Sequence, residues 1–556
     1  MQHSPSVKLG SKLSLFSFAL LWLLIAPMQS AAQSPAPPVP ATGSAAAELK
    51  TARYFDSIKT QPLDVYAFLR EMPKGADLHL HLSGSIYAES FIEWAAKAKP
   101  DVCVDPNTFA LSFCSGNSTQ IPASRALTDG VLYRKMLYAW SMLNLENSGL
   151  SGHDQFFDAF AKFGPASDTA RFADMVAEVA KRSATERVSY LEIMLTPDNG
   201  KSREAGRALI WKSDEELAAL STAELNAYFA QKRDALLAGG IVQPISSGTT
   251  SAIQETKAVM DKLETQLRDL LRCADPSKAS PACQLQIRYV YQVARSLAPR
   301  EAFAQMVGAM EIMKAEPRVV ALNMVQAEDT RASMNNFPLQ MKMLDYLNTV
   351  TEYKTGNVTL HAGELAPGLV PPEGLRFHIR DSVQLGHAKR IGHGVDVMYE
   401  DKPYELLKEM AAKNVLVEVC LTSNDGILGV RGKEHPLSAY LKAGVPVALA
   451  TDDLGISRSE MTQEYAKAVK DHGLDYRQLK RMARNSLEYS FVGGASFWKD
   501  SQRFVPVAVC QSSLQSANPS AACQSYLGSN ARAKLQFELE QAFIQFEKNC
   551  CGNFGK

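Results

Sequence analysis

The stretch "MPKGADLHLHLSGSI" at residues 72–86 decides the fold, because its short apolar run carries two histidines two positions apart. In a β-strand, residues i and i+2 point to the same face, so His79 and His81 are predicted to lie side by side. The rest of the run, residues 76–82, is largely apolar, as in a strand that is covered on both faces. The chain has only ten histidines in 556 residues, so two on one strand face need a chemical explanation.

Seven further runs repeat this apolar pattern and are predicted to be strands. They span residues 188–195, 285–294, 319–325, 357–363, 390–394, 415–421 and 446–452. Most are rich in Val, Ile and Leu, and segments of helical periodicity separate most of them. Eight buried strands alternating with helices predict an α/β fold of the (β/α)8, or TIM-barrel, type. An open doubly wound sheet is the alternative, but no glycine-rich phosphate loop follows any run.

The barrel is expected to occupy residues 51–495, with two connections longer than the fold needs. These helical insertions lie at about 88–187 and 198–284, and the second is interpreted as two or three helices. Residues 496–556 are expected to form a C-terminal extension with a cysteine loop and a helix.

The first 50 residues are predicted to stand apart from the barrel. Lys8 and Lys12 precede an apolar run of about fifteen residues and then small residues at 30–32, so residues 1–32 are interpreted as a cleaved export signal. A retained membrane anchor is the alternative, but a spanning helix needs ~20 apolar residues. Residues 33–50 are rich in Pro and Ala and are predicted to be a disordered linker. We therefore expect a periplasmic or secreted protein without a membrane contact after cleavage.

The cysteine pattern agrees with an exported protein. Six of the nine cysteines form three pairs, each closing a short loop, which favours local disulfides. The pairs are Cys103 and Cys114, Cys273 and Cys283, and Cys510 and Cys523. A cysteine metal site is disfavoured, because the chain contains no C-x-x-C motif.

The charge balance limits the partners of the protein. Lys and Arg number 59, as do Asp and Glu, so the formal net charge is zero. A neutral chain does not attract polyanions, which argues against nucleic acid or an acidic membrane surface as a partner. The oligomeric state is left open, a homodimer included.

Polar residues that can bind metal or move protons follow four of the predicted strands. Beside His79 and His81, they are His361 and Glu364 in "HAGE", His393 in "GHG", and Asp452 and Asp453 in "TDD". In a (β/α)8 barrel, the carboxyl ends of the strands meet at one rim and carry the functional side chains.

Imidazole nitrogens and a carboxylate oxygen are typical ligands of zinc, and a catalytic site leaves one position open for water. The predicted ligands are His79, His81, His361 and Asp452. A single histidine in an apolar strand is more often a satisfied core residue. Several such groups on different strands are unfavourable unless they share a partner. A second metal ion would need a bridging group such as a modified lysine, and the run 319–325 has none, so we expect one ion per chain.

Glu364 and His393 are the candidates for acid–base chemistry. A histidine near a metal can take or orient the proton of a bound water. A glutamate in a dry pocket can have its pKa raised enough to donate a proton. Asp453 is expected to accept a hydrogen bond from the substrate.

The ordered motifs "MPKGADLHLHLSGSI", "HAGE", "RIGHG" and "HPLSAYLKAGVPVALATDD" resemble the adenosine deaminase family of metal-dependent barrel hydrolases over about residues 65–490. The export signal, cysteine loops and insertions are similar to the secreted adenosine-deaminase growth-factor branch. The resemblance implies that Glu364 protonates a purine ring nitrogen and that Asp453 contacts the imidazole side of the purine. His393 would serve the attacking water as base or electrostatic partner. The implied reaction converts adenosine or 2'-deoxyadenosine to inosine or 2'-deoxyinosine and ammonia.

Two positions depart from the family pattern, and both concern the substrate. Ser83 stands where many members have an aspartate that contacts the ribose, and Gln326 stands where the family often has a glycine whose backbone meets the purine. Adenine or another 6-substituted purine is therefore an alternative substrate. A non-catalytic secreted signalling or binding protein is the alternative from another class, but it would be expected to have lost a ligand or an acid–base residue.

Overall fold

The predicted strand runs form parallel strands in the computed structural model, which describes residues 43–116, 119–354, 356–514, 516 and 518–553. The predicted export signal and residues 33–42 of the predicted linker lie outside this range. The strands are β1 (Gly75–His81), β5 (Val188–Leu195), β6 (Gln286–Ala294), β7 (Val319–Val325), β8 (Thr359–Ala362), β9 (Arg390–His393), β10 (Leu416–Val419) and β11 (Val447–Leu449).

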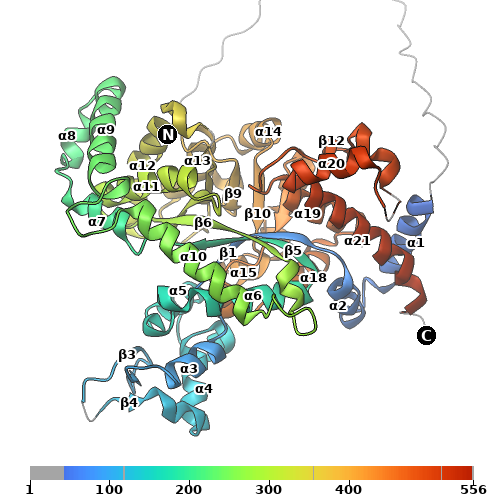
Figure 1. Cartoon of the computed structure of the whole chain (residues 1–556), viewed down its shortest axis with the longest axis horizontal. Helices are drawn as coiled ribbons and strands as arrows, with labels where there is room; N and C mark the ends of the chain where they lie inside the picture. The colour runs from blue at the N-terminus through green and yellow to red at the C-terminus, as the bar shows by residue number, and fades with distance from the viewer. Residues whose placement is uncertain (1–42, 117–118, 355, 515, 517, 554–556) are drawn as a thin grey trace, which may run out of the picture. The chain divides into compact units, whose positions relative to one another are not determined.

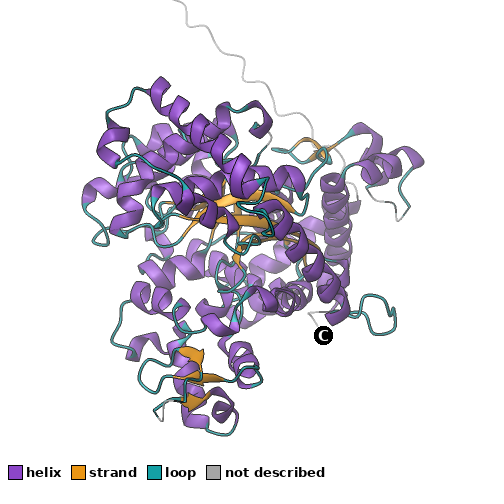
Figure 2. Ribbon diagram, turned by 60° about the vertical axis from the view of Figure 1, so that its left-hand side comes forward, coloured by secondary structure: helices purple, strands orange, loops and turns teal. Residues whose placement is uncertain are grey.

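The eight strands close into a barrel. Strands β1, β5, β6 and β7 pair in that order, and β8, β9, β10 and β11 pair in that order. A parallel bridge between Leu322 and Val358 joins β7 to the start of β8, and one between Leu80 and Asp452 joins β1 to the segment after β11. Figure 2 shows the strands at the centre with helices around them. The predicted (β/α)8 barrel is therefore confirmed.

The helices between the later strands, and those that follow β11, cover the barrel. They are α11 (Pro299–Ala315), α12 (Arg331–Thr349), α13 (His378–Gln384), α14 (Pro403–Lys413), α15 (Leu421–Leu428), α16 (Leu437–Ala443), α17 (Leu454–Ser457), α18 (Met461–His472) and α19 (Tyr476–Glu488). Helix α19 illustrates how the sequence starts them. Asp475 accepts the amide of Gln478, whose side chain accepts the amide of Asp475, so two otherwise unpaired N–H groups are satisfied.

Charged side chains lie inside the barrel and are paired there. Arg390 donates to Glu192 (2.6 Å) and to Glu418 (2.5 Å), and all three are fully buried. The guanidinium carbon of Arg390 lies 3.8 Å from the centre of the Phe491 ring. A buried charge persists only when it is paired in this way, so the barrel interior is a polar network that leads from Arg390 to Glu418.

The first insertion follows β1. It contains α3 (Ala88–Ala96), β2 (Val102–Val104), β3 (Leu111–Phe113), β4 (Ile121–Pro122), α4 (Gly130–Ala139), α5 (Gly152–Phe160) and α6 (Phe172–Thr185). The three short strands form an antiparallel sheet in the order β3-β2-β4, which the Cys103–Cys114 disulfide staples. Helix α5 packs against α15 at the carboxyl end of the barrel.

The second insertion follows β5. It contains α7 (Lys201–Ala208), α8 (Asp214–Ala218), α9 (Thr222–Leu236) and α10 (Ala252–Leu270). The prediction of two or three helices was therefore wrong by one α-helix in the described residues 198–284. The cause is local, because Ser213 and Ser221 each form a capping box and start separate helices. The Cys273–Cys283 disulfide closes the loop before β6.

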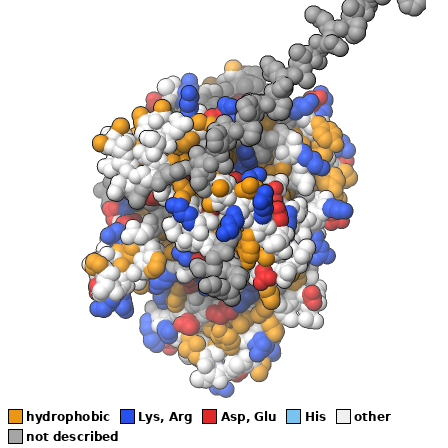
Figure 3. All heavy atoms as spheres, turned by 90° about the vertical axis from the view of Figure 1, so that its right-hand side faces the viewer, with side chains coloured by type: hydrophobic (Ala, Val, Ile, Leu, Met, Phe, Trp, Pro, Cys, Tyr) orange, Lys and Arg blue, Asp and Glu red, His pale blue; other side chains and the backbone are white. Residues whose placement is uncertain are grey.

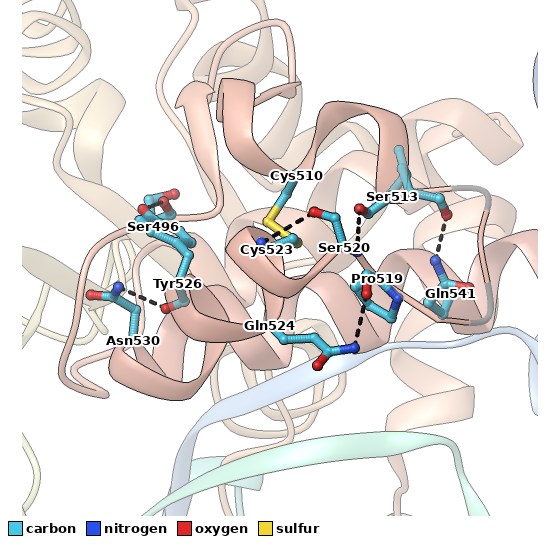
Figure 4. The surroundings of a disulfide bond; sticks show 11 residues. Ser496, Cys510, Ser513, Pro519, Ser520, Cys523, Gln524, Tyr526, Asn530 and Gln541 are labelled. Atoms are coloured by element: carbon cyan, nitrogen blue, oxygen red, sulfur yellow. Dashed lines mark hydrogen bonds between the residues drawn. A yellow bond between two sulfur atoms is a disulfide. The ribbon is translucent and has the colours of Figure 1, made fainter.

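The C-terminal extension packs on the barrel beside the N-terminal helices. It contains β12 (Trp498–Asp500), β13 (Val505–Pro506), α20 (Ala521–Ser529) and α21 (Ala531–Asn553), and the N-terminal helices are α1 (Gly43–Ile58) and α2 (Pro62–Glu71). Figure 4 shows the Cys510–Cys523 disulfide beside α20, where the Tyr526 hydroxyl donates to the Ser496 carbonyl at 2.7 Å. The three predicted disulfides are confirmed.

One boundary of the predicted linker was wrong, because helix α1 already begins at Gly43. Helix α1 lies beside α21 (Figure 1). Glu48, inside the predicted linker, pairs with Lys480 at 2.9 Å and with Arg477 at 3.1 Å. The stretch after Pro40 is alanine-rich and has no further proline, so it forms a helix once α21 covers it.

The surface shows no block of one charge sign on the face drawn in Figure 3, where Lys and Arg side chains are interspersed with Asp and Glu. None of the helices in the described part of the chain combines the length and the apolar character that a bilayer-spanning helix needs.

Gly84, in the turn after β1, and Gly455, in the segment after β11, allow these two segments to contact each other. Substitution of Gly455 tests this close packing. A Cβ on Gly455 would stand 2.1 Å from the carbonyl oxygen of Ile86, where only backbone could move. We expect Gly455→Ala to lower the free energy of unfolding by about 3 kcal/mol, as in an overpacked site. The control is Gly426→Ala in α15, where the nearest atom is 3.6 Å away. Urea denaturation of both variants measures the difference, and equal stabilities would contradict this close packing.

Candidate metal centre and active site

Seven of the predicted site residues lie together at the carboxyl end of the barrel. His79 and His81 are on β1, His361 is on β8 and His393 ends β9, while Glu364 follows β8 and Asp452 and Asp453 follow β11. His79, His393, Asp452 and Asp453 are buried, and the side chain of His81 is 13% exposed. The strand order therefore brings together residues that are up to 374 positions apart in the chain.

Three imidazole nitrogens and one carboxylate oxygen face a common point. Nε2 of His361 is 3.0 Å from Nε2 of His79 and 3.1 Å from Nε2 of His81. Oδ1 of Asp452 is 3.6 Å from Nε2 of His79 and 3.4 Å from Nε2 of His81. Zinc–nitrogen bonds of about 2.0–2.1 Å put tetrahedral ligand atoms about 3.4 Å apart. These side chains therefore fit one divalent ion.

His393 stands beside this group. Its Nε2 is 4.0 Å from Oδ2 of Asp452, the oxygen turned away from the other histidines. Its Nδ1 is 3.7 Å from Oε1 of Glu364. His79, His361, His393 and Asp452 could also be grouped by distance alone. The separations given above among His79, His81, His361 and Asp452 are shorter than the 4.0 Å between His393 and Asp452, which favours the predicted ligands, and this set stays a prediction.

Unpartnered polar atoms mark the same place. Among the described residues, Oδ1 of Asp452, Oε1 of Glu364, Nε2 of His393 and Oδ1 of Asp453 are buried and have no hydrogen-bond partner. A buried polar atom without a partner is costly, so several in one place indicate a site for bound groups. The position of these atoms supports an ion and a polar substrate at this rim.

The other nitrogen of each candidate ligand is held by the protein. Nδ1 of His79 donates to Glu418 at 2.6 Å, and Nδ1 of His361 donates to Oδ1 of Asn323 at 3.0 Å. The side-chain amide of Gln292 lies 3.3 Å from Nδ1 of His81, and its oxygen must accept the Nδ1 proton for Nε2 of His81 to bind a metal. Such contacts orient ligating imidazoles and fix which nitrogen faces the metal. The Nε2 atoms are therefore presented to the common point.

Sequence reasoning missed the three partners of the histidines. Glu418, Asn323 and Gln292 are polar residues in the apolar runs 415–421, 319–325 and 285–294. A polar residue inside a run that is otherwise apolar was the available signal, because burial requires it to have a partner.

Burial and charge set the protonation of the histidines. Burial lowers the pKa of His81 to about 3 and that of His361 well below its usual range, so both are neutral, as ligation requires. Burial alone would lower the pKa of His79, but the hydrogen bond and the charge of Glu418 outweigh it and raise the pKa. Burial would likewise raise the pKa of Glu418, but Arg390 and His79 lower it to about 2. Glu418 is thus a carboxylate that accepts from Nδ1 of His79.

Glu364 is held as a neutral acid. Burial raises its pKa well above the usual range, and the charges of Asp452 and Glu328 raise it further. The turn that carries it is fixed, because Glu328 accepts the backbone amides of Gly363 and Glu364, each at 3.1 Å. Arg295 pairs with Glu328 at 3.4 Å and donates to the carbonyl of His361 at 2.7 Å. Glu364 therefore carries a transferable proton on a rigid support.

Asp452 and Asp453 are packed closely against their neighbours. Ser423 donates to Oδ2 of Asp452 at 2.7 Å, which leaves Oδ1 for the common point. A Cβ on Gly84 would stand 1.5 Å from Oδ1 of Asp453, so only glycine allows this approach. Burial and the charge of Asp452 raise the pKa of Asp453 well above its usual range.

The two residues that depart from the family pattern lie at the edge of the site. Ser83 is half-buried in the turn after β1. Gln326 is exposed, and its side chain accepts the amide of Ser296 at 3.1 Å. Its backbone has φ +84°, a conformation that glycine adopts readily. Substrate contacts for Ser83 and Gln326 stay predictions.

The fold and the site define a class: a closed parallel barrel with a candidate metal centre at the carboxyl ends of its strands. The family profile described as "Adenosine deaminase" matches residues 151–496, which is more than half of the chain. The chain belongs to the adenosine deaminase family. The match begins after β1, so the place of His79 and His81 rests on the barrel closure.

Curated relatives are similar over shorter segments. The adenosine deaminase of Clostridium perfringens is 36% identical over 135 residues, which are 24% of this chain and 37% of that protein. The aminodeoxyfutalosine deaminase of Streptomyces coelicolor is 40% identical over 106 residues, which are 19% of this chain and 27% of that protein. The chain thus spans between about a quarter and a half of the length of the curated relatives it matches. The crystal structure of an adenine deaminase from Arthrobacter aurescens superposes with a TM-score of 0.49 at 16% identity, covering 85% of this chain and 99% of that one.

The contact between Glu418 and His79 gives a test of the metal centre. We expect Glu418→Gln to weaken zinc binding about 10–100-fold, because the amide cannot hold His79 as a carboxylate does. The control is Glu464→Gln. Burial raises the pKa of Glu464 to about 8, so this glutamate is already neutral at pH 7 and the amide resembles it. Competition with a chromophoric chelator measures both affinities, and an unchanged affinity in Glu418→Gln would remove this residue from the centre.

Proposed function

We propose that this protein is a zinc-dependent hydrolase that removes the 6-amino group of adenosine or 2'-deoxyadenosine, giving inosine or 2'-deoxyinosine and ammonia. The observation that carries the proposal is the buried, unpartnered Oε1 of Glu364, which lies 3.7 Å from Nδ1 of His393 and beside a set of side chains that fits one divalent ion. Family membership supports the same chemistry. The partner is a small purine nucleoside, and neither nucleic acid nor a membrane is needed.

Different side chains carry out different steps of the proposed reaction. An ion held by His79, His81, His361 and Asp452 would supply a water that is deprotonated near neutral pH. The unpartnered Oε1 of Glu364 faces the site, and its carboxyl gives a proton to the purine ring nitrogen next to the carbon that bears the amine. Protonation makes this carbon electrophilic, so the hydroxide adds to it. The amine takes the proton of the new hydroxyl group and leaves as ammonia, and the proton released by the water restores the Glu364 acid. His393 orients the attacking oxygen, and Asp453 binds the imidazole side of the purine.

The buried setting assists these steps. His393, Asp452 and Asp453 have little contact with solvent, so fixed protein dipoles replace bulk water around the reacting atoms. The pairing of Arg295 with Glu328 keeps the turn of Glu364 in place during proton transfer.

We also propose that the protein is exported to the periplasm or secreted. The three disulfides favour an oxidising compartment.

The acid role of Glu364 is tested by Glu364→Gln. We expect this variant to bind zinc as the unchanged protein does and to lose a factor of about 10²–10⁴ in kcat, because the amide cannot donate the proton. Glu373→Gln is the matched control and should keep full activity, because Glu373 is an exposed glutamate nearby in sequence. Ultraviolet absorbance follows the reaction. A kcat within a few-fold of the control would exclude Glu364 as the acid.

A second candidate function is deamination of free adenine or another 6-substituted purine. It is favoured by Ser83, which offers a neutral hydroxyl where a charged group would bind the ribose. We expect kcat/KM for adenosine and 2'-deoxyadenosine to exceed that for adenine, and chelation to abolish all turnover. The reverse order on this panel would select the second candidate. Metal binding without turnover of any 6-aminopurine would favour the non-catalytic alternative.

A further inference from the structure

A chain of buried hydrogen bonds ends on His393 and starts on a backbone amide. The amide of Leu437 donates to Nδ1 of His435 at 3.2 Å. Nε2 of His435 lies 3.1 Å from Oδ1 of Asn424, and Nδ2 of Asn424 lies 3.0 Å from Nδ1 of His393. His435, Asn424 and His393 are all buried.

The backbone amide fixes the direction of the chain. Leu437 is the first residue of α16, so its N–H has no acceptor within the helix and can only donate. Nδ1 of His435 must therefore offer a lone pair. Burial lowers the pKa of His435 to about 3, with the nearby His472 acting in the same direction, so the ring is neutral and its single proton is on Nε2.

The next two links follow from the first. Because Nε2 of His435 donates, the group of Asn424 that faces it must be the carbonyl oxygen. The amide nitrogen of Asn424 then faces His393 and donates to Nδ1. A neutral imidazole with an acceptor at Nδ1 carries its proton on Nε2.

The far nitrogen of His393 points into the site. Within the described part of the chain, Nε2 of His393 has no hydrogen-bond partner, and the nearest carboxylate oxygen, Oδ2 of Asp452, is 4.0 Å away. That oxygen already accepts from Ser423. An N–H at Nε2 is therefore free to donate to an oxygen that enters between His393 and Asp452.

We propose that Asn424 and His435 are positioning residues that hold the proton of neutral His393 on Nε2, so that His393 donates a hydrogen bond to the attacking oxygen. No proton leaves His393 in this step. The inference rests on the proposed function for the identity of that oxygen, but the position of the proton does not depend on the substrate. Of the two roles that the resemblance allows for His393, the hydrogen-bond chain selects the electrostatic one.

The test measures directly which ring nitrogen of His393 carries the proton. The zinc-loaded, full-length protein is labelled with ¹⁵N-histidine, and long-range ¹H–¹⁵N correlation identifies the tautomer of each ring. The His393 signals are assigned by their loss in His393→Gln. We expect an unprotonated Nδ1 and a protonated Nε2. A proton on Nδ1 of His393 in the unchanged protein would overturn the inference, whatever the activity.

The variant Asn424→Asp changes the direction of the hydrogen bond between residue 424 and His393. In Asn424→Asp, the carboxylate has only acceptors, so it takes the hydrogen bond of His435 and demands a proton from Nδ1 of His393. We expect Nδ1 to become protonated, kcat to fall about 10²-fold, as when one donor to a developing charge is lost, and KM and zinc content to change little. The control is His472→Gln, because the ring of His472 packs near His435 at 5.6 Å but lies outside the chain.

The NMR measurement and the activity measurement together separate failure of the inference from failure of the proposed function. An unprotonated Nδ1 in Asn424→Asp would contradict the role of Asn424. The expected tautomer in a protein that deaminates no 6-aminopurine would leave the hydrogen-bond chain in place and refute the function.

Discussion

The candidate site depends on four polar atoms that lie close together at one end of a closed barrel. Nε2 of His361 lies 3.0–3.1 Å from Nε2 of His79 and His81, and Oδ1 of Asp452 lies 3.4–3.6 Å from the same two nitrogens. Lone pairs this close repel one another unless a cation lies between them. His79, His361 and Asp452 are buried, so bulk water does not separate these atoms. The shared cation is thus the simplest physical reason for the arrangement, and the buried network around it serves to hold these atoms in place.

Three buried ion pairs, two of them formed by Arg390, support the site. Arg390, between Glu192 and Glu418, keeps Glu418 ionised, and Glu418 in turn orients His79. Arg295 and Glu328 fix the backbone between His361 and Glu364. Buried pairs of this kind contribute little net stability, since desolvation offsets their attraction. Their contribution here is geometric, as expected where catalysis requires groups placed to within a fraction of an ångström.

Much of this could be predicted from the sequence. The apolar runs located the barrel strands, and the strand-end residues gave the candidate ligands, which lie close together because parallel strands in a barrel bring their carboxyl ends to one rim. The inward polar residues Asn323 and Gln292 were missed, since alternation along a buried strand does not reveal which side chain meets a histidine. The left-handed backbone of His393 (φ +67°) and Asp452 (φ +59°) also could not be predicted from the sequence, because such strain is imposed by tertiary contacts. The helix at residues 43–50 likewise depends on packing with α21.

The central claim is that one divalent ion joins these strand ends. Anomalous diffraction at the zinc edge, from crystals of the protein grown with zinc, tests it most directly. The account predicts a single strong peak per chain, within bonding distance of Nε2 of His79, His81 and His361 and of an oxygen of Asp452. A peak elsewhere in the molecule, a second ion at this rim, or an active protein without any peak would contradict it.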